Sequence, residues 1–184
     1  MTIIKTAIEG PFIVEPRVFG DARGYFFESF NQRDFAEQTG LELDFVQDNE
    51  SRSTYGVVRG LHFQRPPYAQ AKLVRVVEGS VLDVAVDIRR GSLTYGQYVA
   101  VELSSENHRQ FYVPHGFAHG FAVLSDTAVF QYKCDNYYHP ESEGALAWDD
   151  PDLAIDWQIA PDAVLLSDKD RSHPRLVDFE TPFC

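Results

Sequence analysis

Three histidines are the residues of this chain that most clearly could do chemistry. His62 lies in an apolar segment beside Arg59, and His115 and His119 lie four residues apart in another. On a helix this spacing would suit a metal, but the surrounding glycines and aromatic residues favour a strand, on which residues four apart share a face. The three imidazoles could form a metal site, although no His-x-His pair or nearby glutamate completes such a set. The alternative is that each is a core or surface residue with satisfied hydrogen bonds.

The segment around His62 also makes a structural prediction. Strict alternation would place Arg59 and His62 on opposite faces of a strand. Both can reach one cavity only if the strand is irregular, and Gly60 is where we expect a bulge. Tyr132 and the pair Lys169-Asp170 are weak indications of function on their own. A tyrosine on a strand normally packs against its neighbours, and a charged pair normally lies in an exposed loop.

Positive charge is concentrated in one stretch of an acidic protein. The net charge is −12, yet residues 51–77 contain five basic side chains and no acidic one: Arg52, Arg59, Arg65, Lys72 and Arg75. One interpretation is that these cations pair with carboxylates elsewhere in the chain. The other is an anion site for a small phosphorylated ligand, because guanidinium groups match phosphate oxygens. Neither a GxxxxGK[ST] nor a GxGxxG motif is present, so side chains on strands would hold the anion.

Many short strands must position these residues. Between residues 12 and 134 strand-like segments recur at short intervals, and the 14% aromatic content favours β structure. We expect strands at 12–19, 24–30, 43–47, 57–63, 71–78, 81–88, 97–103, 110–113, 117–124 and 127–134. Gly79-Ser80 and Ser125-Asp126 are expected to be hairpin turns, and one short helix, 32–38, should be capped by Asn31 and ended by Gly40.

This pattern predicts an all-β fold, an antiparallel barrel or double-sheet jelly roll with a few short helices. We expect a single domain over 1–184. Its barrel core should span about 10–135, and proline-rich loops and short helical turns should wrap it from about 136 to 184.

Composition excludes several classes of partner. An excess of 28 acidic over 16 basic residues argues against nucleic acid and against an anionic membrane surface. The chain has only two cysteines and no apolar run long enough to span a membrane. With no signal peptide at its N-terminus, it is expected to be cytoplasmic.

Seven co-ordered motifs together resemble one family. The chain is similar to the dTDP-4-dehydrorhamnose 3,5-epimerases of the cupin superfamily from about residue 3 to residue 176. The segments that carry the resemblance are 19–30 (Phe-Gly-Asp-Ala-Arg-Gly-Tyr-Phe-Phe-Glu-Ser-Phe), 47–53 (Gln-Asp-Asn-Glu-Ser-Arg-Ser), 59–64 (Arg-Gly-Leu-His-Phe-Gln), 71–75 (Ala-Lys-Leu-Val-Arg), 114–121 (Pro-His-Gly-Phe-Ala-His-Gly-Phe), Tyr132 and Tyr137-Tyr138. Glu50 is a departure, because relatives often have a histidine there.

The resemblance implies a reaction and roles for its residues. A dTDP-linked 4-keto-6-deoxyhexose would lose and regain protons at C3 and C5, beside the ketone, with no cofactor. By resemblance His62 is the base, Asp170 supports its imidazolium, Tyr132 returns the proton and Lys72 steadies the enolate oxygen. The imidazole's ordinary pKa of about 6.5 and the phenol's of about 10 suit these roles.

The resemblance also implies binding residues and a partner. The residues matched to substrate contacts are Arg23, Phe26, Glu28, Gln47, Asn49, Arg59, Lys72, His119, Tyr138, Glu143 and Lys169, with Tyr138 on the thymine. A homodimer is implied, in which N-terminal strands complete the partner's sheet. Three alternatives stay open: an epimerase of C3 or C5 alone, a metal-dependent cupin using His62, His115 and His119, and a non-catalytic sugar-nucleotide-binding protein.

Overall fold

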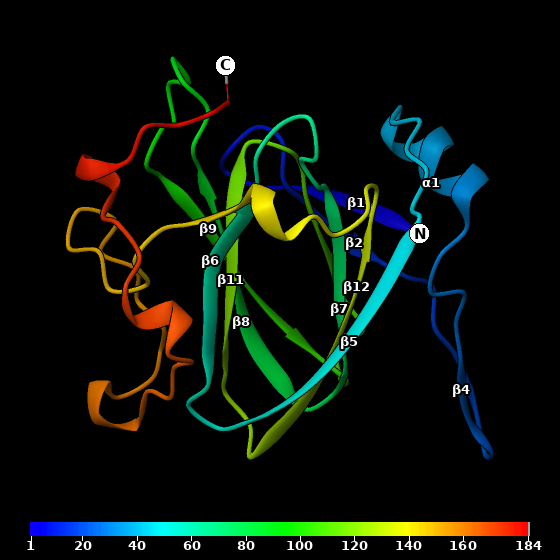
Figure 1. Cartoon of the computed structure of the whole chain (residues 1–184). Helices are drawn as coiled ribbons and strands as arrows, with labels where there is room; N and C mark the ends of the chain where they lie inside the picture. The colour runs from blue at the N-terminus through cyan, green and yellow to red at the C-terminus, as the bar shows by residue number, and fades with distance from the viewer. Residues whose placement is uncertain (184) are drawn as a thin grey trace.

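Two antiparallel β-sheets face each other in the computed structural model, which describes residues 1–183 (Figure 1). One sheet has six strands in the order β1 (Thr2–Lys5), β2 (Phe12–Glu15), β10 (Gln110–Val113), β7 (Lys72–Glu78), β12 (Thr127–Cys134) and β5 (Gln47–Thr54). The other has five in the order β13 (Glu143–Ala145), β6 (Val58–Gln64), β11 (Phe117–Val123), β8 (Ser80–Asp87) and β9 (Tyr98–Ser104). The prediction of a mostly β, antiparallel protein is confirmed.

Apolar side chains from both sheets fill the space between them. Val74 and Phe130 come from the six-stranded sheet, and Leu103 and Phe121 come from the five-stranded sheet; all four are buried in one cluster. The rings of Phe121 and Phe130 stack across the gap with centroids 4.2 Å apart. This core fixes the spacing of the sheets, and with it the width of any cavity left between them.

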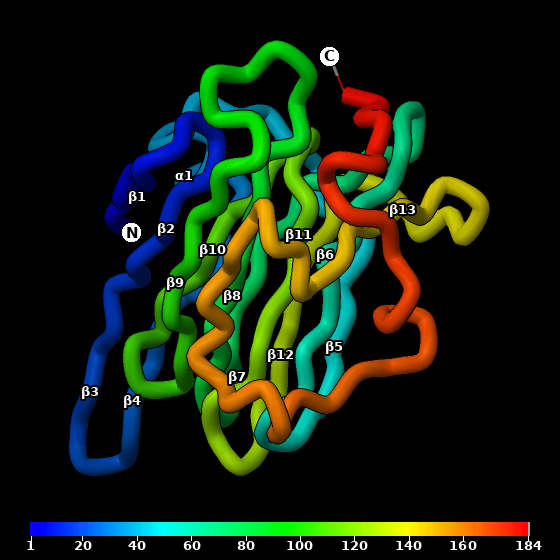
Figure 2. Tube along the Cα trace, turned by 90° about the vertical axis from the view of Figure 1, so that its left-hand side faces the viewer, coloured from blue at the N-terminus to red at the C-terminus, as the bar shows by residue number. Residues whose placement is uncertain are grey.

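Chain outside the sheets covers their outer faces. The C-terminal segment lays Leu146, Trp157 and Phe183 over the outer face of the five-stranded sheet (Figure 2). It contains the short turns expected there: η1 (Pro140–Ser142), η2 (Pro161–Ala163), η3 (Lys169–Arg171) and η4 (Leu176–Asp178). Because this sheet is covered on both sides, β8 is buried along nearly its whole length and shows no polar alternation.

One short helix, α1 (Gln32–Thr39), packs against the six-stranded sheet through the buried Phe35. The Asn31 side chain accepts from the backbone N–H groups of Arg33 and Asp34, and Gly40 ends the helix with a φ of 73°. Both caps lie where the sequence predicts them, because a side-chain amide oxygen and a left-handed glycine satisfy the free groups of a helix end.

Two predictions about connections are wrong. Gly79-Ser80 and Ser125-Asp126 do not join hairpins, because β7 and β8, like β11 and β12, belong to different sheets. Connections of one residue, Gly79, and of three residues, 124–126, are enough for the chain to turn from one sheet to the facing one.

The expected strand at 43–47 is also wrong, and three strands were missed. The chain over most of that segment is irregular and packs Leu43 and Phe45 beside α1. The strand in this region is β5, Gln47–Thr54, an edge strand whose polar residues alternate between partly buried and exposed positions, as the pleat of a strand requires. The other missed strands are β1 and β13.

The expected long strands at 12–19 and 24–30 form only in part. Residues 12–15 are β2, and a separate two-stranded hairpin follows. It consists of β3 (Phe19–Asp21) and β4 (Gly24–Phe26) and projects away from both sheets (Figures 1 and 2). All six residues of its strands are exposed. None of the helices among residues 1–183 is long and apolar enough to cross a membrane.

Candidate active site

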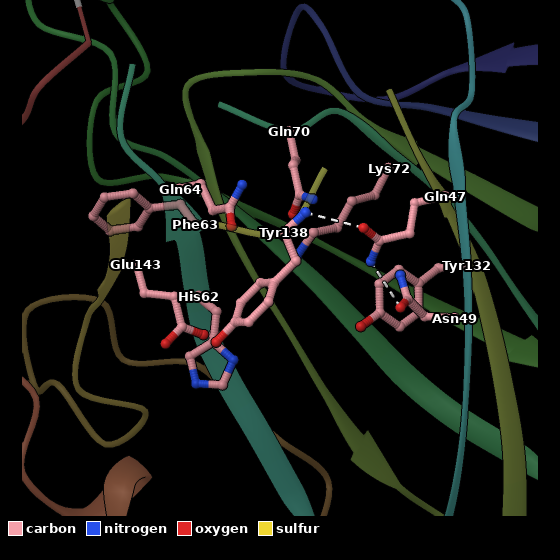
Figure 3. A pocket seen from close by; sticks show the side chains of 10 residues that line it. All are labelled: Gln47, Asn49, His62, Phe63, Gln64, Gln70, Lys72, Tyr132, Tyr138 and Glu143. Carbon is pink, nitrogen blue, oxygen red and sulfur yellow. Dashed lines mark hydrogen bonds between the residues drawn. The ribbon is translucent and has the colours of Figure 1, made fainter. Parts of the chain in front are cut away.

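Two adjoining cavities open between the sheets, and His62, Lys72 and Tyr132 line both. Figure 3 shows the first of them. The cavities have volumes of about 300 Å³ and 280 Å³. The first is also lined by Gln47, Asn49, Tyr138 and Glu143, and the second by Arg59, His119, Lys169 and Asp170. Almost all the residues assigned from the sequence to chemistry and ligand contact therefore meet around one hollow.

A bulge in β6 turns Arg59 and His62 to the same side. In the pairing with β11, His62 lies opposite His119 and Arg59 lies opposite Phe121, so two residues of β6 face one residue of β11. The irregularity predicted at Gly60 is confirmed. Gly60 has a φ of 131°, and a Cβ there would meet Gly120 Cα at 2.5 Å, so no other residue fits this approach.

Asp170 holds the His62 ring from the C-terminal segment. Its Oδ1 lies 2.5 Å from His62 Nε2, and Ser167 Oγ donates to its Oδ2 at 2.8 Å. Burial would raise the pKa of Asp170, but the hydrogen bonds from His62 and Ser167 outweigh it and hold that pKa below its ordinary value. The carboxylate is therefore ionised near neutrality and can stabilise a protonated imidazole beside it.

Tyr132 and Lys72 face this dyad from the six-stranded sheet. Burial raises the pKa of the Tyr132 phenol, so the hydroxyl keeps its proton near neutrality. Lys72 Nζ lies 5.7 Å from the centre of the Tyr132 ring, and burial lowers the pKa of its ammonium. A base on one sheet and a proton donor and cation on the other can act on opposite faces of a ring bound between them.

The basic residues of 51–77 do not pair with carboxylates. Among residues 1–183 none of the five takes part in a salt bridge, so the first interpretation of the basic stretch is wrong. Arg59 donates to Ser53 Oγ at 3.2 and 3.1 Å, and Arg75 donates to Gln131 Oε1. Arg59 and Lys72 thus bring positive charge to the cavity without a salt bridge to any carboxylate of residues 1–183.

The other two histidines of the alternative metal set have carboxylate partners of their own. His119 Nε2 lies 2.8 Å from Oδ1 of the buried Asp83, and His115 Nε2 lies 2.9 Å from Asp135 Oδ2. His119 lines the cavity, whereas His115 does not line either of the two hollows. The arrangement therefore gives no support to a metal held by His62, His115 and His119.

Polar residues at the mouth of the cavity fix its loops. Gln47 accepts from the Tyr138 backbone N–H at 2.9 Å and donates to Asn49 Oδ1 at 2.9 Å (Figure 3). Lys169 donates to Glu143, and this bond raises the pKa of the Lys169 ammonium. Tyr138 is exposed, with its ring at the open side.

Three residues matched to substrate contacts lie outside the cavity. Arg23 and Phe26 belong to the projecting β3–β4 hairpin, where Arg23 pairs with Asp21, and Glu28 follows β4. None of the three lines either hollow within this chain. Glu50 also faces away, because it lines a separate depression on the outer side of the six-stranded sheet and accepts from Gln131 at 2.6 Å.

Sequence reasoning missed the residues that position these side chains. Ser167 supports Asp170, Asp83 supports His119 and Ser53 holds Arg59. A serine three residues before an aspartate at a turn is a recognisable signal. Asp83 lies 36 residues from His119, so only the sheet register could have identified it. Ser53 lies only six residues before Arg59, but on the facing sheet, so its contact depends on how the two sheets pack.

The fold and the site define a class of protein: paired antiparallel sheets that present an imidazole, a phenol and free cations to one ligand cavity. The dTDP-4-dehydrorhamnose 3,5-epimerase family model matches residues 5–178. The chain belongs to that family.

Curated relatives and solved structures agree. The Escherichia coli K12 dTDP-4-dehydrorhamnose 3,5-epimerase is 56% identical over 170 residues, covering 92% of this chain and 91% of the relative. The crystal structure of the Elizabethkingia anophelis enzyme of the same name is 56% identical, with a TM-score of 0.93 over 97% of each chain. The Legionella pneumophila dTDP-6-deoxy-D-glucose-3,5-epimerase, solved in complex with dTDP-4-keto-L-rhamnose, is 53% identical, with a TM-score of 0.93 over 97% of this chain and 94% of that one.

Proposed function

We propose that this chain converts dTDP-4-dehydro-6-deoxy-D-glucose to dTDP-4-dehydro-L-rhamnose by inverting C3 and C5, in dTDP-L-rhamnose biosynthesis. The observation that carries the proposal is that His62 and Tyr132, from opposite sheets, line the same hollow. Family membership and the 4-keto-sugar complex of a relative support the substrate class.

The chemistry depends on the ketone at C4. His62 takes a proton from C5 or C3, and the electron pair of the broken C–H bond moves onto the ketone oxygen as an enolate. Asp170 stabilises the imidazolium that forms, and Lys72 stabilises the oxyanion. Tyr132 then returns a proton to the opposite face of the same carbon, and the ketone re-forms. The step is redox-neutral.

The binding residues divide by chemistry. Arg59 and Lys72, which form no salt bridge within residues 1–183, offer positive charge to the diphosphate or the sugar oxygens. Tyr138 offers an exposed ring for stacking on thymine. Polar contacts to the rest of the ligand are assigned to Gln47, Asn49, His119, Glu143 and Lys169.

We further propose that the active unit is a homodimer. The β3–β4 hairpin exposes Phe19, Tyr25 and Phe26, and an isolated two-stranded hairpin is marginally stable in water. Packed on a second copy, the hairpin would bring Arg23, Phe26 and Glu28 to the partner's cavity. Sedimentation equilibrium should give twice the monomer mass, and a monomer with full activity would contradict the assignment of these three residues.

The finer architecture is part of the same proposal. The two-sheet arrangement and the structures of the relatives support a cupin-like jelly roll. Residues 1–184 would form one catalytic unit, because Lys169 and Asp170 of the C-terminal segment line the cavity together with residues of the strands. A biosynthetic enzyme acting on a sugar nucleotide is expected in the cytoplasm.

A coupled assay tests the activity. The protein is incubated with dTDP-4-dehydro-6-deoxy-D-glucose, the pathway reductase and NADPH, and dTDP-L-rhamnose should form. Proton NMR in deuterated water separates the single-centre alternative, because a C3 or C5 enzyme would exchange one position only. Absence of exchange at both positions would contradict the proposal.

A further inference from the structure

His173 lies next to the His62–Asp170 dyad and has no role in the proposed reaction. Its side chain is 13% exposed, and its Nε2 atom is buried without a hydrogen-bond partner. Asp170 Oδ1 lies 3.4 Å from that atom and 2.5 Å from His62 Nε2. The two imidazole rings meet edge-on, with centroids 5.8 Å apart and planes at 89°. Two ring nitrogens therefore converge on one carboxylate oxygen.

These three donors suit a transition-metal cation. Their ligand atoms all lie within 4.8 Å of one another. Two imidazoles and a carboxylate are a donor set that zinc takes when a fourth position stays open. Ligands about 2.1 Å from a tetrahedral ion lie about 3.4 Å apart. The His173–Asp170 separation already has this value, whereas the His62–Asp170 contact of 2.5 Å must widen.

We propose that His62, Asp170 and His173 form a binding site for Zn²⁺ or a similar divalent cation, and that its occupation switches the catalytic base off. The cation would reach the site through the cavity, because the His62 side chain is 34% exposed there while Asp170 is buried. The site is inhibitory and differs in two of its three residues from the metal set of the cupin alternative.

The inhibition follows from the two nitrogens of His62. In the dyad, neutral His62 carries its proton on Nε2, toward Asp170, so the Nδ1 lone pair is free to accept a proton from a ligand. Figure 3 shows one ring nitrogen directed toward the side of Tyr138. A cation can bind Nε2 only through the lone pair of that nitrogen, so the ring proton must move from Nε2 to Nδ1. The base then presents an N–H donor to the substrate, with no change in the number of protons.

Calorimetric titration of the full-length protein with ZnCl₂ tests the site and needs no turnover, so it is decisive even if the proposed reaction is wrong. We expect one site in the wild type. His173→Ala and His173→Gln should weaken it by at least about tenfold, as loss of a supporting group does in other metal sites. His115→Ala, which removes an imidazole paired with Asp135 outside the cavity, should leave it unchanged. Circular dichroism establishes that each variant is folded.

A second readout concerns the ring itself. In protein carrying ¹⁵N-labelled histidine, Zn²⁺ should move the His62 proton from Nε2 to Nδ1, and EDTA should reverse the change. In the epimerase assay, both His173 variants should turn over at the wild-type rate but resist Zn²⁺. Absent binding in the wild type, unchanged binding in both folded His173 variants, or binding lost only in His115→Ala would overturn the proposal.

Discussion

The imidazole of His62 and the carboxylate of Asp170 are 108 residues apart in sequence and 2.5 Å apart in space. The first lies on a central strand of one sheet, and the second lies in a short turn of the C-terminal segment. The segment that covers the outer face of the five-stranded sheet therefore also completes the dyad to which we assign the base.

Asp170→Asn should lower kcat by about 100- to 10,000-fold with little change in the mid-point of thermal unfolding. The amide cannot stabilise an imidazolium and can turn its N–H toward the ring, which favours the wrong tautomer. Ser167→Ala, which removes one donor to the same carboxylate, should cost far less. Steady-state kinetics on the two purified variants make this comparison; equal losses would indicate that Asp170 is merely structural.

Tyr132→Phe should separate proton abstraction from inversion. The ring still packs against the core, but it has no proton to return to the second face of the sugar. We expect deuterium to enter C3 or C5 from the base side while the yield of the rhamno product falls at least about 100-fold. The measurement is NMR of the sugar after incubation in deuterated water. Normal epimerisation would exclude Tyr132 as the acid.

Lys72→Met should lower kcat by about 100-fold or more, because the enolate oxygen loses its cation. A matched control is Lys5→Met, at the end of an edge strand far from the cavity in the chain's topology. Rapid-quench measurement of the chemical step would show the loss in Lys72→Met alone. If only KM rises, Lys72 serves binding and not the transition state.

Asp87 should make stability depend on pH in acid. This buried carboxylate accepts from Arg89, Ser92 and Thr94. Burial would raise its pKa, but these hydrogen bonds, led by Arg89, hold it at about 2, below the ordinary 3.8. The unfolded chain binds the proton more readily, so the stabilisation is complete above about pH 5 and is lost as the pH falls through 3.8 toward 2.

The size of this effect can be measured with Asp87→Asn. A depression of nearly two pKa units corresponds to about 2 kcal/mol of unfolding free energy at neutral pH, roughly half of which should be gone by pH 3. Urea unfolding should show that the difference in unfolding free energy between wild type and Asp87→Asn is smaller at pH 3 than at pH 7. The control Asp162→Asn, at an exposed position, should show no such trend. If that difference in unfolding free energy did not depend on pH, the ionised carboxylate of Asp87 would not be its source.

Sequence reasoning predicted the elements whose signals are local. The α1 caps, Asn31 and Gly40, and the bounds of β10 and β12 agree with the structure, because each depends on neighbouring residues. The bulge at Gly60 was predictable for a different reason: Arg59 and His62 could share a cavity only if alternation failed between them.

What sequence could not predict depends on the partner strand. The polar β5 carries no apolar stripe because it is an edge strand, and the short connections at 79–80 and 125–126 do not say whether the next strand pairs or crosses to the facing sheet. The same limit applies to the site. His119 was assigned, but its buried partner Asp83 lies 36 residues away on β8 and is found only through register.

The base assigned to His62 is the central claim, and solvent exchange tests it most directly. Wild type, His62→Ala and the control His115→Ala are incubated with the 4-keto sugar nucleotide in deuterated water, with folding established by circular dichroism. We predict deuterium at both C3 and C5 with the wild type and the control, and none at either carbon with folded His62→Ala. Deuterium appearing at the wild-type rate with His62→Ala would show that another group removes the protons.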